Sequence, residues 1–100
     1  MKIVRLRTEN METPYGISAR EPVFSWNAVT QEKNWKQKSY RIIVTDKDSC
    51  VWDSGRIASD QMLQIPYEGE PLKSDTRYEW RVEVEGSDNS FCQSEKTWFE

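Results

Sequence analysis

The most constraining feature of this sequence is a stretch at 77–85 in which large apolar and charged side chains alternate. The apolar residues are Tyr78, Trp80, Val82 and Val84, and glutamates or an arginine stand between them. A period of two places successive side chains on opposite faces of a β-strand, so one face is buried and the other meets water. The stretch is predicted to be a long strand of an antiparallel sheet.

Shorter stretches of apolar, aromatic and β-branched residues carry the same signal, and polar turn residues separate them. The further predicted strands span 2–7, 23–28, 39–45, 51–52, 62–65 and 96–99. No segment has the period of an amphipathic helix. About seven short strands in a chain of 100 residues are typical of an all-β Greek-key β-sandwich.

The alternation also predicts which side chains share a face of a strand. Val4 and Leu6 share one side of the first strand. In the second strand, Phe24 and Trp26 share the side that is predicted to face the core, and Ser25 lies opposite.

Tyr78 and the two cysteines are predicted to have structural roles. Leu72 precedes Tyr78 by six residues across a turn, as in a tyrosine corner, where the phenol bonds to upstream backbone. Cys50 and Cys92 are expected near opposite ends of paired strands, farther apart than the roughly 7 Å between Cα atoms that a disulfide allows. Two free thiols are therefore predicted.

Composition excludes several classes of chemistry. The chain has no histidine, which removes the Ser-His-Asp and Cys-His nucleophile arrangements and all zinc sites with histidine ligands. Its four glycines are scattered, so no phosphate-binding loop can be written, and two cysteines are too few for a metal cluster. No cofactor and no metal are expected.

Charge and hydropathy narrow the range of partners. The net charge is −3, and no cluster of lysine and arginine is present to neutralise phosphates, so nucleic acid is not an expected partner. No run approaches the roughly 20 apolar residues of a membrane span, and the first residues lack the pattern of a signal peptide. A membrane is not an expected partner either.

Five segments carry recognisable motifs in a fixed order: 10–17 with Pro14-Tyr15-Gly16-Ile17, then 22–26, 40–44, 51–57 and 71–82. With Trp52-Asp53-Ser54-Gly55 in the middle, this set resembles the N-terminal fibronectin-III-like domain of bacterial α-L-rhamnosidases, glycoside hydrolase family 78. The resemblance covers nearly the whole chain. Two positions depart from the family pattern: Val23 stands where arginine is usual, and Ser74 where proline is frequent.

The resemblance implies a fibronectin-III/immunoglobulin-like fold and an accessory role. In that family the catalytic carboxylates belong to a separate helical barrel domain farther along the chain, and nothing here corresponds to that domain. No catalytic residue can be carried over. Residues 1–100 would then be one domain of a larger periplasmic or extracellular glycosidase, and the other domains of that enzyme would be its partners.

Carboxylates are the first candidates for catalysis, because glycosidases use two of them about 5 to 10 Å apart. Glu79, Glu83 and Glu85 meet this spacing loosely along one face of the strand at 77–85. Arg81 stands between them on the same face, and the opposite face is core. A solvated, charge-paired sheet face therefore explains these residues without chemistry.

Tryptophans are the candidates for binding, since indole rings offer flat apolar platforms with a polar edge. Trp35, Trp52 and Trp98 are the candidate contacts to a sugar or to a neighbouring domain. Trp35 lies in a polar loop at 30–38, which in a sandwich shares one end with the loop at 86–90. Packing over a sheet edge or against a neighbouring domain is the structural alternative for all three.

Three functions remain open from the sequence. The first is a non-catalytic accessory module that packs against other domains, with an exposed apolar patch expected around Trp52 or Trp98. The second is a carbohydrate-binding module that takes rhamnose-containing glycans on exposed tryptophans. The third is an adhesion or receptor-type module that binds another protein.

Overall fold

The structure is a computed structural model, and it describes residues 2–8, 22–30, 34–47, 49–69, 72–73 and 76–99. Sequence interpretations that rest on 10–17, on Pro71 and on Ser74 lie outside the described residues. Eight strands occur in the described ranges: β1 (Lys2–Thr8), β2 (Val23–Val29), β3 (Gln37–Asp46), β4 (Ser49–Asp53), β5 (Ile65–Pro66), β6 (Tyr78–Gly86), β7 (Phe91–Gln93) and β8 (Thr97–Phe99).

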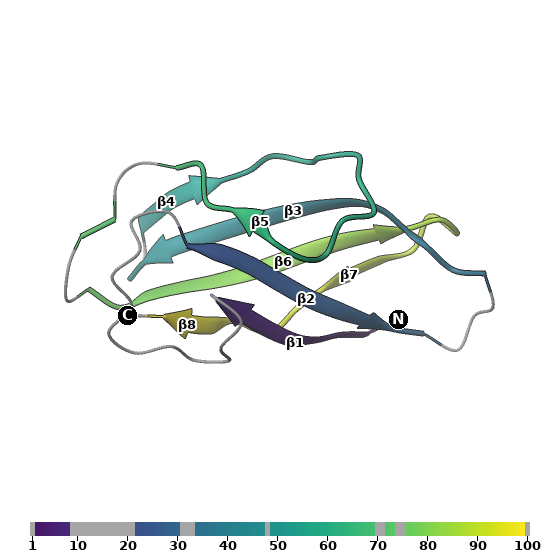
Figure 1. The fold of residues 1–100 in the computed structure, drawn as a ribbon, viewed down its shortest axis with the longest axis horizontal. Coiled ribbons are helices and arrows are strands. Elements are labelled where there is room, and N and C mark those ends of the chain that lie inside the picture. The colour runs from purple at the N-terminus through teal and green to yellow at the C-terminus, as the bar shows by residue number, and fades with distance from the viewer. Residues whose placement is uncertain are drawn as a thin grey trace.

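The strands form two antiparallel sheets that pack face to face (Figure 1). The smaller sheet has the order β1-β2-β5, and the larger has the order β4-β3-β6, with both β7 and β8 paired to the outer edge of β6. Strands of both sheets run roughly along the long axis of a molecule that measures 42 × 22 × 21 Å. The predicted all-β sandwich is confirmed.

The core lies between the sheets and follows the alternation of β6. All four apolar residues of that strand are buried, and the residues between them are half-buried on the outer face. Aromatic rings fill the centre: the ring of Phe24 lies 4.6 Å from that of Trp80 and 5.9 Å from that of Phe99, measured between centroids. Each large apolar side chain that is fully buried contributes roughly 1.5–3 kcal/mol.

The prediction that Val4 and Leu6 share one side of the first strand is wrong. Ile3 is the core residue of β1, whereas Val4 is only half-buried. Arg5 has a positive φ of 55°, and the pairing with β2 shifts register between Val4 and Arg7. This β-bulge interrupts the period of two, so residues before and after it do not follow one alternation.

Ser25 lies opposite the core-facing side chains of β2, as the alternation predicts, yet it is buried. Its strand is the central one of the smaller sheet, so side chains of β1 and β5 flank it on both sides.

The strand predicted at 62–65 is shorter and later than expected. Only Ile65–Pro66 pairs with β2, because Gln64 has a positive φ of 56° that breaks the extended backbone before it. Met62 still contacts the core, and its carbonyl accepts a hydrogen bond from the Trp26 backbone N–H at 3.0 Å. Pro66 is tolerated because β5 is an edge strand, where a missing N–H donor leaves no partner unpaired.

The strand predicted at 96–99 is found as β8, Thr97–Phe99, and a further strand, β7, pairs with the same edge of β6 before it. β7 was missed because three residues give too little alternation to detect. Between β7 and β8, the Ser94 hydroxyl accepts the Val82 N–H at 3.0 Å, while the Ser94 N–H donates to the Val82 carbonyl at 2.9 Å. A side chain thus replaces a backbone acceptor, and the regular ladder is interrupted there.

Two local predictions are confirmed. The Tyr78 hydroxyl accepts a hydrogen bond from the Lys73 backbone N–H at 2.8 Å, which is the predicted tyrosine corner. Cys50 is exposed and Cys92 is half-buried, and both are free thiols.

Candidate functional site

The outer face of the larger sheet carries the three glutamates of β6, and basic side chains surround them. Glu83 lies 4.0 Å from Arg41, 3.8 Å from Arg56 and 3.7 Å from Arg81, measured between nitrogen and oxygen. Glu85 accepts a hydrogen bond from the Ser39 hydroxyl at 3.1 Å and lies 4.0 Å from the Lys38 amine, while Glu79 pairs across the sheet with Trp98. These carboxylates line a flat, charge-paired face.

The motif Trp52-Asp53-Ser54-Gly55 has a structural role at the edge of the same sheet. Arg41 donates to both carboxylate oxygens of Asp53, at 2.9 and 2.5 Å, and the Gly55 N–H donates to Asp53 as well. Together these hydrogen bonds, led by that of Arg41, lower the pKa of Asp53 to about 2. The Ser54 hydroxyl accepts the Ile42 N–H at 2.8 Å, so the turn after β4 is fastened to β3.

Trp52 and Trp98 both make contacts within the domain. Trp52 is half-buried and stacks on Phe24 with ring centroids 6.2 Å apart, and its edge contacts Tyr67 at 5.1 Å. Trp98 is half-buried beside Glu79 of the neighbouring strand, and the Arg77 guanidinium lies 4.1 Å above its ring centroid. This geometry matches the packing alternative for both residues.

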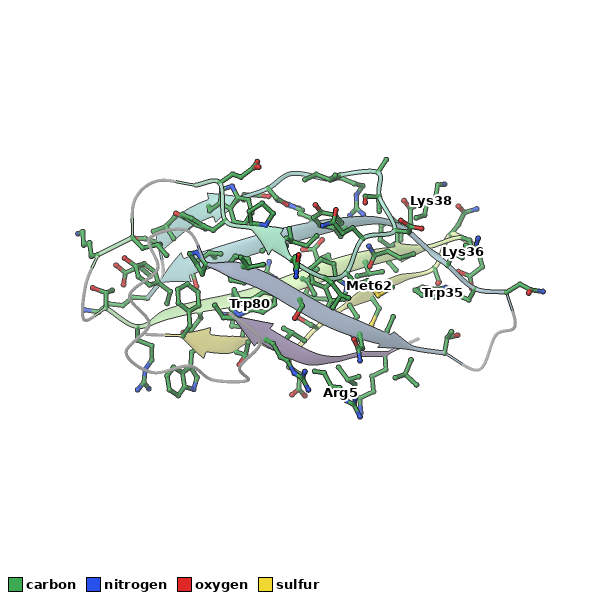
Figure 2. All side chains as sticks on the ribbon, in the orientation of Figure 1. Arg5, Trp35, Lys36, Lys38, Met62 and Trp80 are labelled. Atoms are coloured by element: carbon green, nitrogen blue, oxygen red, sulfur yellow. The ribbon has the colours of Figure 1, made fainter. Side chains whose placement is uncertain are left out.

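Trp35 lies at the end of the sandwich where β2 and β6 finish, next to the turn after β6 (Figure 2). The Lys36 N–H donates to the Ser87 hydroxyl at 3.1 Å, and the Ser87 N–H donates to the Lys36 carbonyl at 2.8 Å. A Cβ atom on Gly86 would come within 2.7 Å of the Trp35 ring, so only glycine permits this approach. The two segments meet as the sequence predicts.

A cavity of about 550 Å³ opens beside Trp35. Its walls come from the end of β2, the start of β3 and the connection between β4 and β5; they comprise Ala28, Val29, Thr30, Trp35, Lys36, Gln37, Asp60 and Met62. Trp35 is the one lining residue that the sequence singled out. Asp60 and Met62 were missed as cavity residues, because 53–61 carries no periodic signal and Met62 was assigned to the strand predicted at 62–65.

Gln37 fixes that connection in place. Its side-chain amide donates to the carbonyls of Ser59 and Gln61, at 3.0 and 2.9 Å, and its oxygen accepts the Trp26 indole N–H at 2.9 Å. The Gln37 side chain therefore forms a fixed wall of the cavity, with its donors and acceptor already used.

The structure does not bring the three candidate tryptophans together. Trp35 is at one end, whereas β4 and β8, which carry Trp52 and Trp98, lie nearer the other end (Figure 1). The strongly exposed large apolar side chains of the described ranges also lie elsewhere: Val29, Ile57, Leu63 and Phe91. The apolar patch expected around Trp52 or Trp98 is therefore wrongly placed, since core packing covers much of the first ring and Arg77 covers the second.

The described residues contain neither a metal-binding group of side chains nor a membrane-spanning helix. No three Cys, Asp or Glu side chains in the described ranges are grouped so that they could hold a metal ion. Nor does this part of the chain include a helix that is long and apolar enough to cross a membrane.

Two antiparallel sheets in this strand order define an immunoglobulin-like β-sandwich. Asp53 and Glu83 are paired with arginines, and an open cavity lies at one end of the sandwich. The chain belongs to the family described as the Rha78A-like N-terminal immunoglobulin domain, whose model matches residues 3–100. The resemblance to the N-terminal domain of α-L-rhamnosidases is thereby confirmed.

Relatives and solved structures agree with this family. An α-L-rhamnosidase of Streptomyces avermitilis is 31% identical over 100% of this chain and 10% of its own length. The crystal structure of that organism's enzyme with L-rhamnose matches 99% of this chain and 10% of its own with a TM-score of 0.93. The α-L-rhamnosidase of Dictyoglumus thermophilum matches all of this chain and 12% of its own at 30% identity, with a TM-score of 0.92.

A relative from Formosa agariphila, also an α-L-rhamnosidase, is 31% identical over 87% of this chain and 10% of its own length. The chain thus spans about a tenth of the length of the curated relatives that it matches. What it shares with them is the N-terminal immunoglobulin-like domain.

Proposed function

We propose that this chain is the non-catalytic N-terminal accessory module of an α-L-rhamnosidase and that it packs against other domains of that enzyme. The observation that carries the proposal is the match over residues 3–100 to a family of N-terminal domains, in relatives about ten times longer. The substrate specificity and the catalytic step belong to the rest of such an enzyme.

The charge arrangement of the described residues supports an accessory role. A glycosidase needs two carboxyl groups that face each other across a substrate-sized gap. Here Glu83 and Glu85 are neighbours on one flat sheet face, and basic side chains lie within 4.0 Å of each. Ion pairing on the outer face of a sheet accounts for both carboxylates without catalysis.

Exposed apolar side chains support the packing part of the proposal. Ile57 and Phe91 are 38% and 63% exposed, and the guanidinium of Arg56, the chain neighbour of Ile57, lies 4.9 Å from the Phe91 ring centroid. Exposed apolar area of this kind frequently marks contacts between domains. The proposal also includes a parent enzyme that works in the periplasm or outside the cell, where rhamnose-containing glycans are accessible.

The test uses the parent enzyme with and without residues 1–100. We expect the truncated enzyme to lose thermal stability, because a domain contact is lost, while the kcat of the remaining folded molecules on an aryl α-L-rhamnoside changes by less than about threefold. The 100-residue chain alone is expected to leave the same substrate intact. The proposal would be overturned if the chain alone hydrolysed the substrate at a rate that rises and falls with the fraction of folded chain.

A gene that encodes no catalytic domain beside this one would favour the adhesion-type function instead. In that case the isolated chain is expected to bind another protein, and binding would be measured with the purified partner.

A further inference from the structure

We propose that the cavity beside Trp35 is a binding site for a neutral pyranose ring. Packing against another domain does not require such a site, so this inference goes beyond the proposed function. It depends on the shape of the cavity, on its mixture of apolar and polar walls, and on the rigidity of the segments that form it.

The size and the apolar walls suit a single sugar ring. A volume of about 550 Å³ lies within the usual range of small-molecule sites, about 300–1,000 Å³. Val29 and Met62 supply aliphatic surface, and the half-buried indole of Trp35 lies at the same end of the molecule (Figure 2). A pyranose carries C–H groups on its ring faces, which pack on surfaces of this kind.

The polar groups on the rim suit hydroxyl groups. Asp60 and Lys36 are exposed cavity residues, and the Asp60 carboxylate and the Lys36 amine make no hydrogen bond or ion pair with other described residues. Each oxygen of a carboxylate accepts hydrogen bonds and an ammonium donates three, so each group can serve hydroxyls of a ring in the cavity.

The same two groups argue against a charged ligand. Among the described lining residues, Asp60 and Lys36 carry one charge of each sign, so these side chains favour neither a phosphate nor a cation. The Gln37 amide cannot take part, because its hydrogen bonds to Ser59, Gln61 and Trp26 use it within the domain. A neutral ligand rich in hydroxyls fits this balance best.

The walls are held rigidly before any ligand arrives. Gln37 fixes the connection that carries Asp60 and Met62, and the paired hydrogen bonds between Lys36 and Ser87 fix the backbone beside Trp35. A site that is already ordered loses little conformational entropy on binding. This rigidity distinguishes the cavity from an incidental gap between surface loops.

The test is an NMR titration of the ¹⁵N-labelled chain with L-rhamnose, L-fucose, D-galactose and D-glucose, each up to tens of millimolar. The five indole N–H signals report on the tryptophans separately. We expect at least one sugar to give saturable shifts of the Trp35 indole and of the amides at 60–62, with a Kd on the order of 1 mM. The signals of Trp52 and Trp98 should stay unchanged.

Two substitutions at exposed positions avoid unfolding the domain. Asp60→Asn and Lys36→Gln are expected to weaken binding at least about fivefold, because each replaces a charged hydrogen-bonding group with a neutral group whose hydrogen bonds are weaker. Glu95→Gln is the matched control, since Glu95 is an exposed carboxylate outside the cavity, and it should leave the Kd unchanged.

Three results would overturn the proposal: no saturable shift with any of the four sugars, equal shifts with glycerol, or a Kd that neither Asp60→Asn nor Lys36→Gln alters. None of these results bears on the accessory role, which depends on the parent enzyme with and without residues 1–100. Conversely, hydrolysis by the isolated chain would overturn the accessory role and leave the sugar site untouched.

Discussion

Tyr78 joins the start of β6 to the segment before it through a hydrogen bond, and to β8 through a ring contact. Its hydroxyl accepts the Lys73 N–H at 2.8 Å, and its ring stacks on Phe99 with centroids 5.5 Å apart. Tyr78→Phe removes only the hydrogen bond, so the free energy of unfolding is expected to fall by about 1 kcal/mol with the ring contact kept. Urea denaturation measures this loss.

The control for that substitution is Lys73→Ala. The donor to Tyr78 is the backbone N–H of Lys73, and the lysine side chain is exposed. Stability should therefore change little. A loss in Lys73→Ala equal to that in Tyr78→Phe would contradict the role of the tyrosine hydroxyl.

Asp53 makes the stability of the domain depend on acid pH. The hydrogen bonds from Arg41 and Gly55 lower its pKa from 3.8 to about 2 in the folded state. Folding thus favours the ionised carboxylate, and this contribution is complete at neutral pH and is lost as the pH falls from about 4 to about 2. In Arg41→Gln the Asp53 pKa should rise towards its ordinary value.

Carboxyl ¹³C shifts, followed from pH 6 downwards, measure that pKa in both forms of the protein. An Asp53 that titrates near 3.8 in the unsubstituted chain would show that the ion pair does not form in solution.

Among single elements, the connection between β4 and β5 depends most on one side chain. The buried Gln37 amide holds the carbonyls of Ser59 and Gln61 and accepts the Trp26 indole N–H. Gln37→Leu leaves these groups without partners, and each buried unpaired group costs about 1–3 kcal/mol. Amides at 59–62 should then exchange with deuterium faster than in the unsubstituted chain.

Gln61→Ala serves as the comparison for that prediction. The Gln61 side chain is exposed and donates only to the neighbouring Leu63 carbonyl at 2.9 Å. Loss of this hydrogen bond should lower the free energy of unfolding by a few tenths of a kcal/mol at most. If both substitutions accelerate exchange equally, Gln37 is not what holds the connection.

Elements with a clean local period were predictable from the sequence, and irregular ones were not. β6 follows its alternation from end to end, and β3 differs from its prediction by two residues at one end and one at the other. β1 and β5 deviate from their predictions because Arg5 and Gln64 adopt a left-handed backbone conformation. Their residue types do not indicate this conformation. β7 is too short to show a period.

At the scale of the whole molecule, the two-sheet architecture was predictable because each strand carries its own local signal. The cavity was not, since it joins Trp35 to Asp60 and Met62 through folding of a segment without periodicity. The sequence identified Trp35 as a loop residue beside the turn after β6, and the structure supplied the groups that face it. Tertiary packing determines which residues that are far apart in the chain come into contact.

The two thiols differ in their access to solvent across the molecule. Cys50 is exposed on the edge strand β4, whereas Cys92 is half-buried on β7. Without reductant, the chain is expected to form a disulfide-linked dimer through Cys50, because its thiol is the more accessible of the two to a second molecule. Cys50→Ser should abolish the dimer on a non-reducing gel, and Cys92→Ser should not; the reverse pattern would contradict the assigned exposure.

The irregular edges of both sheets have a consequence for how the domain behaves at high concentration. β1 is broken by the bulge at Arg5, and β5 has two residues and a proline. In the larger sheet, β4 has five residues and an irregular pairing with β3, and the outer edge of β6 carries strands divided at Ser94. Amyloid growth needs a flat run of about six paired residues on an open edge. These four edges offer no such template, so many copies can stand close together without adding strands to one another.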